Sequence, residues 1–298
     1  MRGRAVLGLV ALVLTGCATS APGGKGHPLE VVAAESAWGS LVAQLGGPHV
    51  HVTSLVRSAG ADPHDYEPTA ADARRLATAD LTLVNGVGYD TWATRLLAAN
   101  PRASRVDVVV GKVVGVPGGG NPHRWYSPAD VRSVVDAVAA ALQRLDPDHA
   151  ADLAAQRTAL LTGRLAPYFD AVATLRSRYA GTPVGASESA FAPLAEAMSL
   201  RLLTPPAYLA AVSEGTDPTP RDTSTVADQI ADHRVRVYVF NTQNATPDVQ
   251  AQVATARAKG VPVVAITETP LPADASFEDW QVGQLTRLAD ALAQGTSR

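Results

Sequence analysis

Two histidines in proline-flanked turns are the residues of this sequence best suited to chemistry. His64 lies in the string DPHDYEP (residues 62–68) and His123 in the string NPHRW (residues 121–125). Proline fixes its own φ and favours an extended conformation in the residue before it, so both imidazoles are presented from stiff turns. Neutral imidazole is the commonest metal ligand among side chains, and a rigid backbone lowers the entropic cost of ordering a site. The two turns therefore predict a metal site that the fold assembles.

The N-terminal segment predicts export. Arg2 and Arg4 precede an apolar run, residues 5–14, that is too short to span a bilayer as a helix. A basic start followed by a short apolar core that ends in small residues is typical of a secretory signal. The run ends in LTGC (residues 14–17), which resembles a bacterial lipobox, in which the cysteine is lipidated and becomes the first residue of the mature chain. The alternative is a chance cysteine in a cleaved signal.

Cys17 is the only cysteine of the chain. A single cysteine excludes an intramolecular disulfide and argues against a thiolate metal site. If several acyl chains are attached to Cys17, each buried CH₂ adds about 0.8 kcal/mol of membrane affinity. We therefore expect residues 1–17 to be a lipoprotein signal peptide with lipobox Cys17, and residues 18–28, which are small, polar and rich in Pro and Gly, to form a flexible tether.

Composition narrows the class of protein further. The formal net charge is −3 and no basic block is present, so a nucleic-acid partner is not indicated. The mature chain, about 280 residues, is long enough for two lobes of ordinary domain size.

Beyond the tether, short apolar runs alternate with helical patterns. Strands are predicted over residues 29–34, 49–56, 81–85, 105–110, 183–186, 200–203, 235–241 and 261–267, and helices over residues 38–45, 70–79, 89–99, 191–198, 223–232, 249–259 and 279–293. This alternation favours open, mostly parallel α/β sheets. We expect two such lobes, residues 29–146 and 181–298.

The middle of the chain has a different pattern. Residues 127–145 and then 147–179 are rich in Ala, Leu and Arg with helical apolar spacing and little Gly. A helix of about thirty residues is roughly 45 Å long. One interpretation is an ordinary packed helix pair. The more specific interpretation is a long rigid helix, residues 147–180, that joins the two α/β lobes and limits hinge closure.

Taken together, DPHDYEP, NPHRW, the long helix and the lipobox resemble the metal-receptor lipoproteins of ABC importers, the long-helix (cluster A-I) class that binds zinc, manganese or iron. The resemblance covers essentially all of the mature chain. It implies a metal site in the cleft between the lobes, with two histidines from the first lobe and two ligands from the second.

The resemblance also implies the ligands. His64 and His123 match the two histidines, and Glu188, in ASESAF (residues 186–191), matches a His or Glu near a strand end. The fourth ligand is usually an Asp after a Thr at the end of the last strand. Here Glu268 follows Thr267, so the carboxylate is one methylene longer.

Other interpretations of these carboxylates stay open. Glu188 could instead stabilise the N-terminus of the helix near Phe191, an interaction typically worth about 0.3–1 kcal/mol. Glu268 could be a surface carboxylate beside the turn at Pro270. For the remaining histidines we favour surface positions: His49 and His51 facing solvent from one strand, His27 in the tether, and His149 and His233 on helical stretches.

Residues around the ligands are expected to support the site. Asp62 or Asp65 could hold the second nitrogen of His64, since metal-bound histidine usually donates its other N–H to a carboxylate or carbonyl. We expect Tyr66 and Trp125 to pack around the site and exclude water. The polar run 241–243 follows a predicted strand, at the end where open α/β folds gather ligands.

The function implied is capture of a divalent metal and its delivery to an ABC permease and its ATPase subunit, without covalent chemistry, by a lipid-anchored monomer outside the cytoplasm. Two imidazoles and two carboxylates give a neutral complex with one Zn²⁺ or Mn²⁺. Affinity order favours zinc. The loop 114–120 lacks the long His- and acid-rich insertion of many zinc-specific relatives, and the ligand set resembles that of manganese and iron members.

Two alternatives stand against the receptor. One is a secreted metallohydrolase with a His/His/Glu site, although the sequence has no HExxH or GxSxG motif. The other is an adhesin-like lipoprotein whose metal is structural.

Overall fold

The computed structural model describes residues 27–58 and 63–297. The expected signal peptide, Cys17, most of the expected tether and Asp62 lie outside the described residues. Among the described helices, none combines the length and the apolar composition needed to cross a bilayer.

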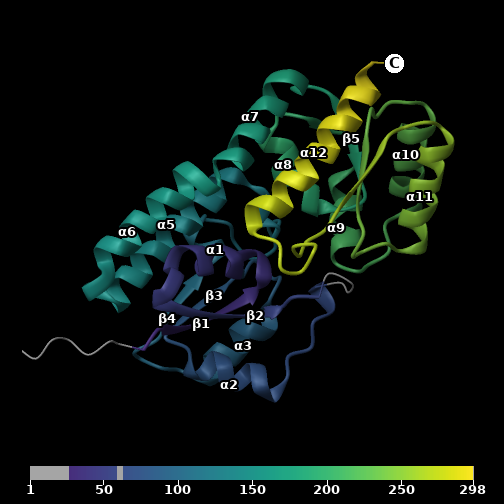
Figure 1. Cartoon of the computed structure of the whole chain (residues 1–298). Coiled ribbons are helices and arrows are strands. Elements are labelled where there is room, and N and C mark those ends of the chain that lie inside the picture. Colours follow the sequence, from purple (N-terminus) through teal and green to yellow (C-terminus); the bar gives the residue numbers. More distant parts are fainter. Residues whose placement is uncertain (1–26, 59–62, 298) are drawn as a thin grey trace, which may run out of the picture.

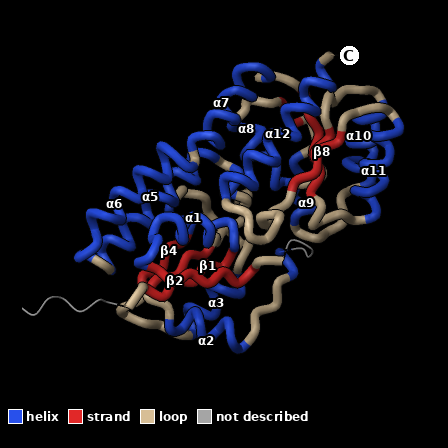
Figure 2. The backbone as a smooth tube through the Cα atoms, viewed as in Figure 1, coloured by secondary structure: helices blue, strands red, loops and turns tan. Residues whose placement is uncertain are grey.

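The described chain forms two α/β lobes, each built on a four-stranded parallel sheet (Figures 1 and 2). The first sheet has the order β2-β1-β3-β4, with β1 Leu29–Glu35, β2 Val50–Val56, β3 Leu81–Val84 and β4 Val106–Val109. The second has the order β6-β5-β7-β8, with β5 Pro183–Ala186, β6 Arg201–Leu202, β7 Tyr238–Asn241 and β8 Val263–Ile266. The α/β fold with two parallel-sheet lobes, expected from the alternating pattern, is confirmed.

Helices cover both faces of each sheet. In the first lobe, α2 Ala70–Thr78 and α3 Thr91–Ala99 lie on one side of the strands and α1 Ser36–Gly46 and α5 Pro128–Leu145 on the other (Figure 1). A short helix of the first lobe, α4 Val110–Val113, follows β4. The second lobe contains α8 Ala192–Ala197, α9 Pro206–Ser213, α10 Pro220–Ala231 and α11 Pro247–Ala258. Because both faces are covered, strands such as LTLV of β3 are buried along their whole length.

Local sequence explains where the main helices begin. The Ser127 hydroxyl accepts a hydrogen bond from the Asp130 backbone N–H, and Pro128 occupies the first turn of α5. The Thr69 side chain and Asp72 form a capping box at the start of α2. Each cap satisfies a backbone donor that the helix itself leaves unbonded.

The expected single helix over residues 147–180 is interrupted. A 3₁₀ turn, Pro147–His149, leads into α6 Ala150–Ala159, then a π-helical segment, Leu160–Arg164, and α7 Ala166–Tyr179. Pro167 has no N–H to donate to the carbonyl of Gly163, and the Leu165 N–H bonds to the Leu160 carbonyl at 2.9 Å. The segment is therefore helical over nearly its whole length, as the long-helix prediction has it, with a π-helical interruption near its middle that the prediction did not include.

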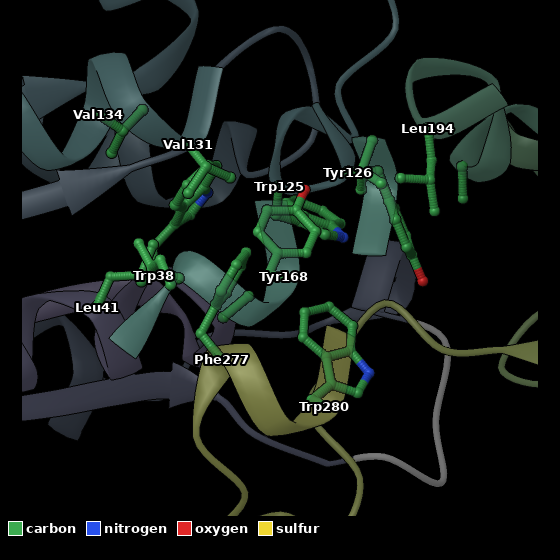
Figure 3. Packing of buried hydrophobic residues seen from close by; sticks show 14 of the residues in the cluster. Trp38, Leu41, Trp125, Tyr126, Val131, Val134, Tyr168, Leu194, Phe277 and Trp280 are labelled. Carbon is green, nitrogen blue, oxygen red and sulfur yellow. The ribbon is translucent and has the colours of Figure 1, made fainter. Parts of the chain in front are cut away.

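The two lobes share one hydrophobic core. Its aromatic centre includes Trp38, Trp125 and Tyr126 from the first lobe and Phe277 and Trp280 from α12 Phe277–Thr296 (Figure 3). The Tyr126 hydroxyl also donates to the Thr267 carbonyl of the second lobe at 2.7 Å. Helix α12 lies beside α7 and reaches α1 (Figure 1). A core that continues across the lobe boundary resists large rotation of one lobe against the other.

Candidate metal centre

The two histidine turns meet at the carboxyl end of the first sheet. His64 lies in the 3₁₀ turn Pro63–Asp65, after β2, and His123 directly precedes the 3₁₀ turn Arg124–Tyr126. Their ring centroids are 5.6 Å apart, although five elements of the first lobe, α2, β3, α3, β4 and α4, lie between them in the sequence. The fold thus brings the two turns together.

Glu268 lies between the two rings. Its Oε2 atom is 3.1 Å from Nε2 of His123 and 3.6 Å from Nε2 of His64. One ligand atom from each of these residues lies within 4.8 Å of the other two. The ligands of a tetrahedral ion with bonds of about 2.0–2.1 Å are roughly 3.3 Å apart. The three side chains therefore match a transition-metal site with little rearrangement.

Glu188, the fourth predicted ligand, is buried beside this group but is separated from it by an amide. Its Oε1 accepts a hydrogen bond from Nδ2 of Asn241 at 2.7 Å, and the same nitrogen is 2.7 Å from Oε1 of Glu268. Oε2 of Glu188 accepts from Nδ2 of Asn244 at 3.1 Å. The structure thus groups three of the predicted ligands and holds the fourth against two asparagine side chains.

Asn121 fixes the tautomer of His123. Its Nδ2 donates to the Ser189 carbonyl at 2.7 Å, so its Oδ1 is the atom that faces Nδ1 of His123 at 2.9 Å. An amide oxygen only accepts, and Nδ1 must therefore carry the ring proton. The lone pair on Nε2 then points towards Glu268, as metal binding requires. Asn121 is part of the NPHRW string, but sequence analysis gave it no role.

Aromatic rings enclose the histidines. Trp125 lies edge-on to His123 with ring centroids 5.5 Å apart, which confirms its expected position. The ring against His64 belongs to Tyr89, at 4.6 Å, and the Tyr89 hydroxyl donates to Oε2 of Glu268 at 2.8 Å. Tyr66 packs on Trp92, donates to Asp72 and lines the open cleft together with His64, as expected of a residue around the site.

A buried carboxyl pair supports the loop that carries Tyr89. Asp90 accepts hydrogen bonds from the backbone N–H groups of Asn85 and Gly86 at 2.6 and 2.7 Å. Burial raises the pKa of Asp90. Burial, and then the charge of Asp90, raise the pKa of Glu35 well above its ordinary 4.5. At least one carboxyl of the pair is therefore favoured in the protonated form, because two buried like charges repel.

The polar run after β7 orients Glu268, as its position at a strand end suggested. Oε1 of Gln243 accepts from the backbone N–H of Glu268 at 2.6 Å and from that of Thr269 at 3.0 Å. Asn241 bridges the two glutamates as described above, whereas the Thr242 hydroxyl donates to the carbonyl of Ile266. Two of the three residues contact the candidate ligands.

Access to the group is from one side. An open cleft of about 960 Å³ is lined by His64, Tyr89 and Asn121 from the first lobe and by Ser189 and Asn244 from the second. The side chains of His123 and Glu268 are fully buried, and that of His64 is 22% exposed. His64 is therefore the candidate ligand that an incoming ion meets first.

The other histidines differ in environment. His51 is 67% exposed on β2 and pairs with Glu30, and His233 and His27 are also exposed, as predicted. The side chain of His49, however, is only 17% exposed, so the prediction that it faces solvent was wrong. It ends a 3₁₀ turn before β2 and packs on the ring of His149.

Comparison with known proteins gives a family match. The family model described as zinc-uptake complex component A, periplasmic, matches residues 31–291. The chain is 31% identical over 153 residues to the manganese-binding lipoprotein MntA of Halalkalibacterium halodurans, covering 49% of this chain and 50% of the relative. It is 28% identical over 158 residues to the manganese ABC transporter substrate-binding lipoprotein PsaA of Streptococcus pneumoniae, covering 48% of this chain and 51% of the relative. The chain thus spans about half the length of these curated relatives.

Solved structures match the fold over most of the chain. The Mn-bound periplasmic metal-binding protein from Candidatus Liberibacter asiaticus superposes with a TM-score of 0.73 at 19% identity, covering 88% of this chain and 98% of that one. FpvC from Pseudomonas aeruginosa in complex with Mn²⁺ gives a TM-score of 0.73 at 22% identity, covering 90% and 99%. At these identities the likeness supports the two-lobed architecture alone.

Proposed function

The chain belongs to the family of zinc-uptake complex component A, and from this premise we propose that it is an extracytoplasmic receptor that captures one divalent metal ion and delivers it to an ABC importer. The observation that carries the proposal is the convergence of His64, His123 and Glu268 at the cleft between the lobes. Histidines of one lobe and a carboxylate of the other meet there, so a bound ion would hold the lobes together.

Glu188 completes the proposed ligand set. Two neutral imidazoles and two carboxylates neutralise a divalent cation, and four protein ligands close the site, whereas catalytic zinc typically keeps a position for water. In the structure Asn241 donates to both glutamates. We infer that metal binding moves the Glu188 carboxylate from the asparagine amides to the ion, a local change that needs no lobe rotation.

The ion that we propose as cargo is zinc or manganese. Two relatives carry manganese in their names, and the family description names zinc. For imidazole and carboxylate donors the affinity order places zinc above manganese. We therefore expect tighter binding of zinc in vitro. The two carboxylates of the proposed ligand set are donors that also suit manganese.

Delivery requires a permease with its ATPase subunit, and the proposed anchor is a lipid on Cys17. The relatives named above are described as lipoproteins, one of them as a substrate-binding component of a manganese ABC transporter. We propose that the protein acts as a monomer on the outer face of a membrane and catalyses no reaction. A receptor fits the buried, convergent ligands better than a metallohydrolase, which needs an open metal position and a general base.

The experiment that tests the proposal is equilibrium binding with matched variants. Zinc and manganese are titrated into metal-free protein in competition with a chelator of known affinity, for wild type, His64→Ala and Glu188→Gln. We expect one tight equivalent in the wild type and weaker binding in both variants. Turnover of a phosphoester or peptide substrate by the metal-loaded protein would instead support an enzyme.

A further inference from the structure

A second group of metal-ligating side chains lies at the opposite end of the first sheet. His49 directly precedes β2, whereas His64 follows the carboxyl end of the same strand. Asp146 follows the last residue of α5, and His149 ends the 3₁₀ turn that leads into α6. The group therefore joins the turn between α1 and β2 to the turn between α5 and α6, away from the cleft.

The spacing of this group would admit a metal ion in place of the His149–Asp146 hydrogen bond. Nδ1 of His149 is 2.8 Å from both carboxylate oxygens of Asp146, and Nδ1 of His49 is 4.0 Å from Oδ2 of the same residue. One ligand atom from each of the three residues lies within 4.8 Å of the other two. Since ligands of a tetrahedral ion are roughly 3.3 Å apart, a small side-chain rotation brings all three to bonding distance.

The stacking of the two rings also favours an ion. The imidazoles of His49 and His149 lie with centroids 4.2 Å apart at an interplanar angle of 31°. The two rings and the Asp146 carboxylate thus bring together nitrogen and oxygen donors of the kinds that transition metals bind.

The surroundings leave room for an ion and a further ligand. A cavity of about 170 Å³ is lined by His27, His49 and Asp146 among others. Oδ2 of Asp152 is 3.8 Å from Nε2 of His49. The side chains of His49 and Asp146 are 17% and 20% exposed and that of His149 is 42% exposed, so the group is partly sheltered and reachable from solvent.

The backbone presents this group as it presents the cleft histidines. Pro48 immediately precedes His49, as Pro63 precedes His64, and Pro147 begins the turn that ends at His149. The fixed φ of proline limits the conformations of each turn and lowers the entropic cost of ordering the ligands.

We propose that His49, Asp146 and His149 bind a second divalent transition-metal ion of the zinc class, with His27 or solvent in the fourth position. The complex carries one carboxylate and is more exposed than the cleft, so it binds zinc more weakly than the cleft does. When occupied, it links the start of β2 to the α5–α6 turn, beside the point where the described chain begins. The site is independent of the proposed delivery function.

The test is a zinc titration of the full chain in which the cleft is disabled by Glu268→Ala. In this background we expect one weaker equivalent, and either His49→Gln or His149→Gln should raise its dissociation constant at least about tenfold, since even partners of metal ligands contribute 10- to 100-fold. His51→Gln is the matched control, because His51 is exposed and lies two residues from His49. Circular dichroism checks that each variant is folded.

Three results would overturn the proposal: no zinc equivalent in the Glu268→Ala protein, an equivalent that survives both substitutions unchanged, or equal loss in the His51→Gln control. A second measurement avoids dependence on the variants. Long-range ¹H–¹⁵N spectra of the Glu268→Ala protein should show zinc-dependent shifts of the imidazole nitrogens assigned to His49 and His149 that saturate at one equivalent. Absence of these shifts would also contradict the site.

Discussion

Replacing Tyr89 by Phe tests how the buried carboxylate is prepared for metal. The Tyr89 hydroxyl donates to Oε2 of Glu268 at 2.8 Å, and the same oxygen faces Nε2 of His64 and of His123. Phenylalanine keeps the ring against His64 and removes only the donor. We therefore expect the substitution to affect the orientation of the carboxylate and to leave the packing of the cleft in place.

The size of the effect follows from the charge of the acceptor. A hydrogen bond to a charged group contributes about 1.5–3 kcal/mol, and about 1.4 kcal/mol corresponds to a factor of ten. The dissociation constant for zinc should therefore rise about 10- to 100-fold in Tyr89→Phe, which is the range found for hydrogen-bond partners of metal ligands. Competitive titration against a chelator of known affinity measures this change directly.

Tyr66→Phe is the matched control for this experiment. It removes one tyrosine hydroxyl from the same lobe, but that hydroxyl donates to Asp72 at the start of α2. Its metal affinity should stay within about twofold of the wild type, because the lost hydrogen bond joins Tyr66 to the α2 capping box and not to a candidate ligand. Unchanged affinity in Tyr89→Phe, or equal losses in both variants, would refute the role assigned to Tyr89.

Three further predictions concern ligands, acidity and motion. His123→Ala should weaken metal binding by far more than the exposed His51→Ala in the same titration, and equal losses would contradict the site assignment. Glu35→Gln should flatten the dependence of stability on pH. Because the pKa of Glu35 is raised, the native state holds a proton that the unfolded state releases, and wild-type stability therefore falls as pH rises above about 4.5. Thermal unfolding at several pH values measures this dependence. Small-angle X-ray scattering with and without metal should show closely similar dimensions, and a large hinge rotation would contradict the shared core.

The fold was predictable where local pattern and global architecture agree. The alternation of short apolar runs with helical patterns predicted both parallel sheets, because strands buried on both faces must read as apolar runs. The interruption of the central helix was not predicted, although Pro167 in the sequence provides its cause. Proline in an otherwise helical pattern removes one backbone donor, and the chain here responds with a π-helical segment rather than a break.

The candidate site was predictable only in part. Proline-flanked turns identify His64 and His123, and the family resemblance adds Glu268; the structure places the three together. Tyr89 and Asn244 carry no local signal, because their roles depend on which loops the two sheets bring into contact.

The second histidine group shows the same limit. His49 and His51 share a strand-like alternation, which suggested one common face. The partner of His49 is His149, which lies far away in the sequence, and a single sequence without paired variation does not reveal such a contact.

The most direct test of the central claim is metal binding by wild type and Glu268→Ala. Purified metal-free protein is offered zinc, manganese and iron(II) in turn, and content and affinity are measured by competitive titration. The account predicts one tight equivalent in the wild type that is lost or strongly weakened in the variant, because Oε2 of Glu268 lies within 3.6 Å of Nε2 of both histidines. Absence of a tight equivalent in the wild type, or equal affinity in the variant, would contradict capture of metal at the cleft.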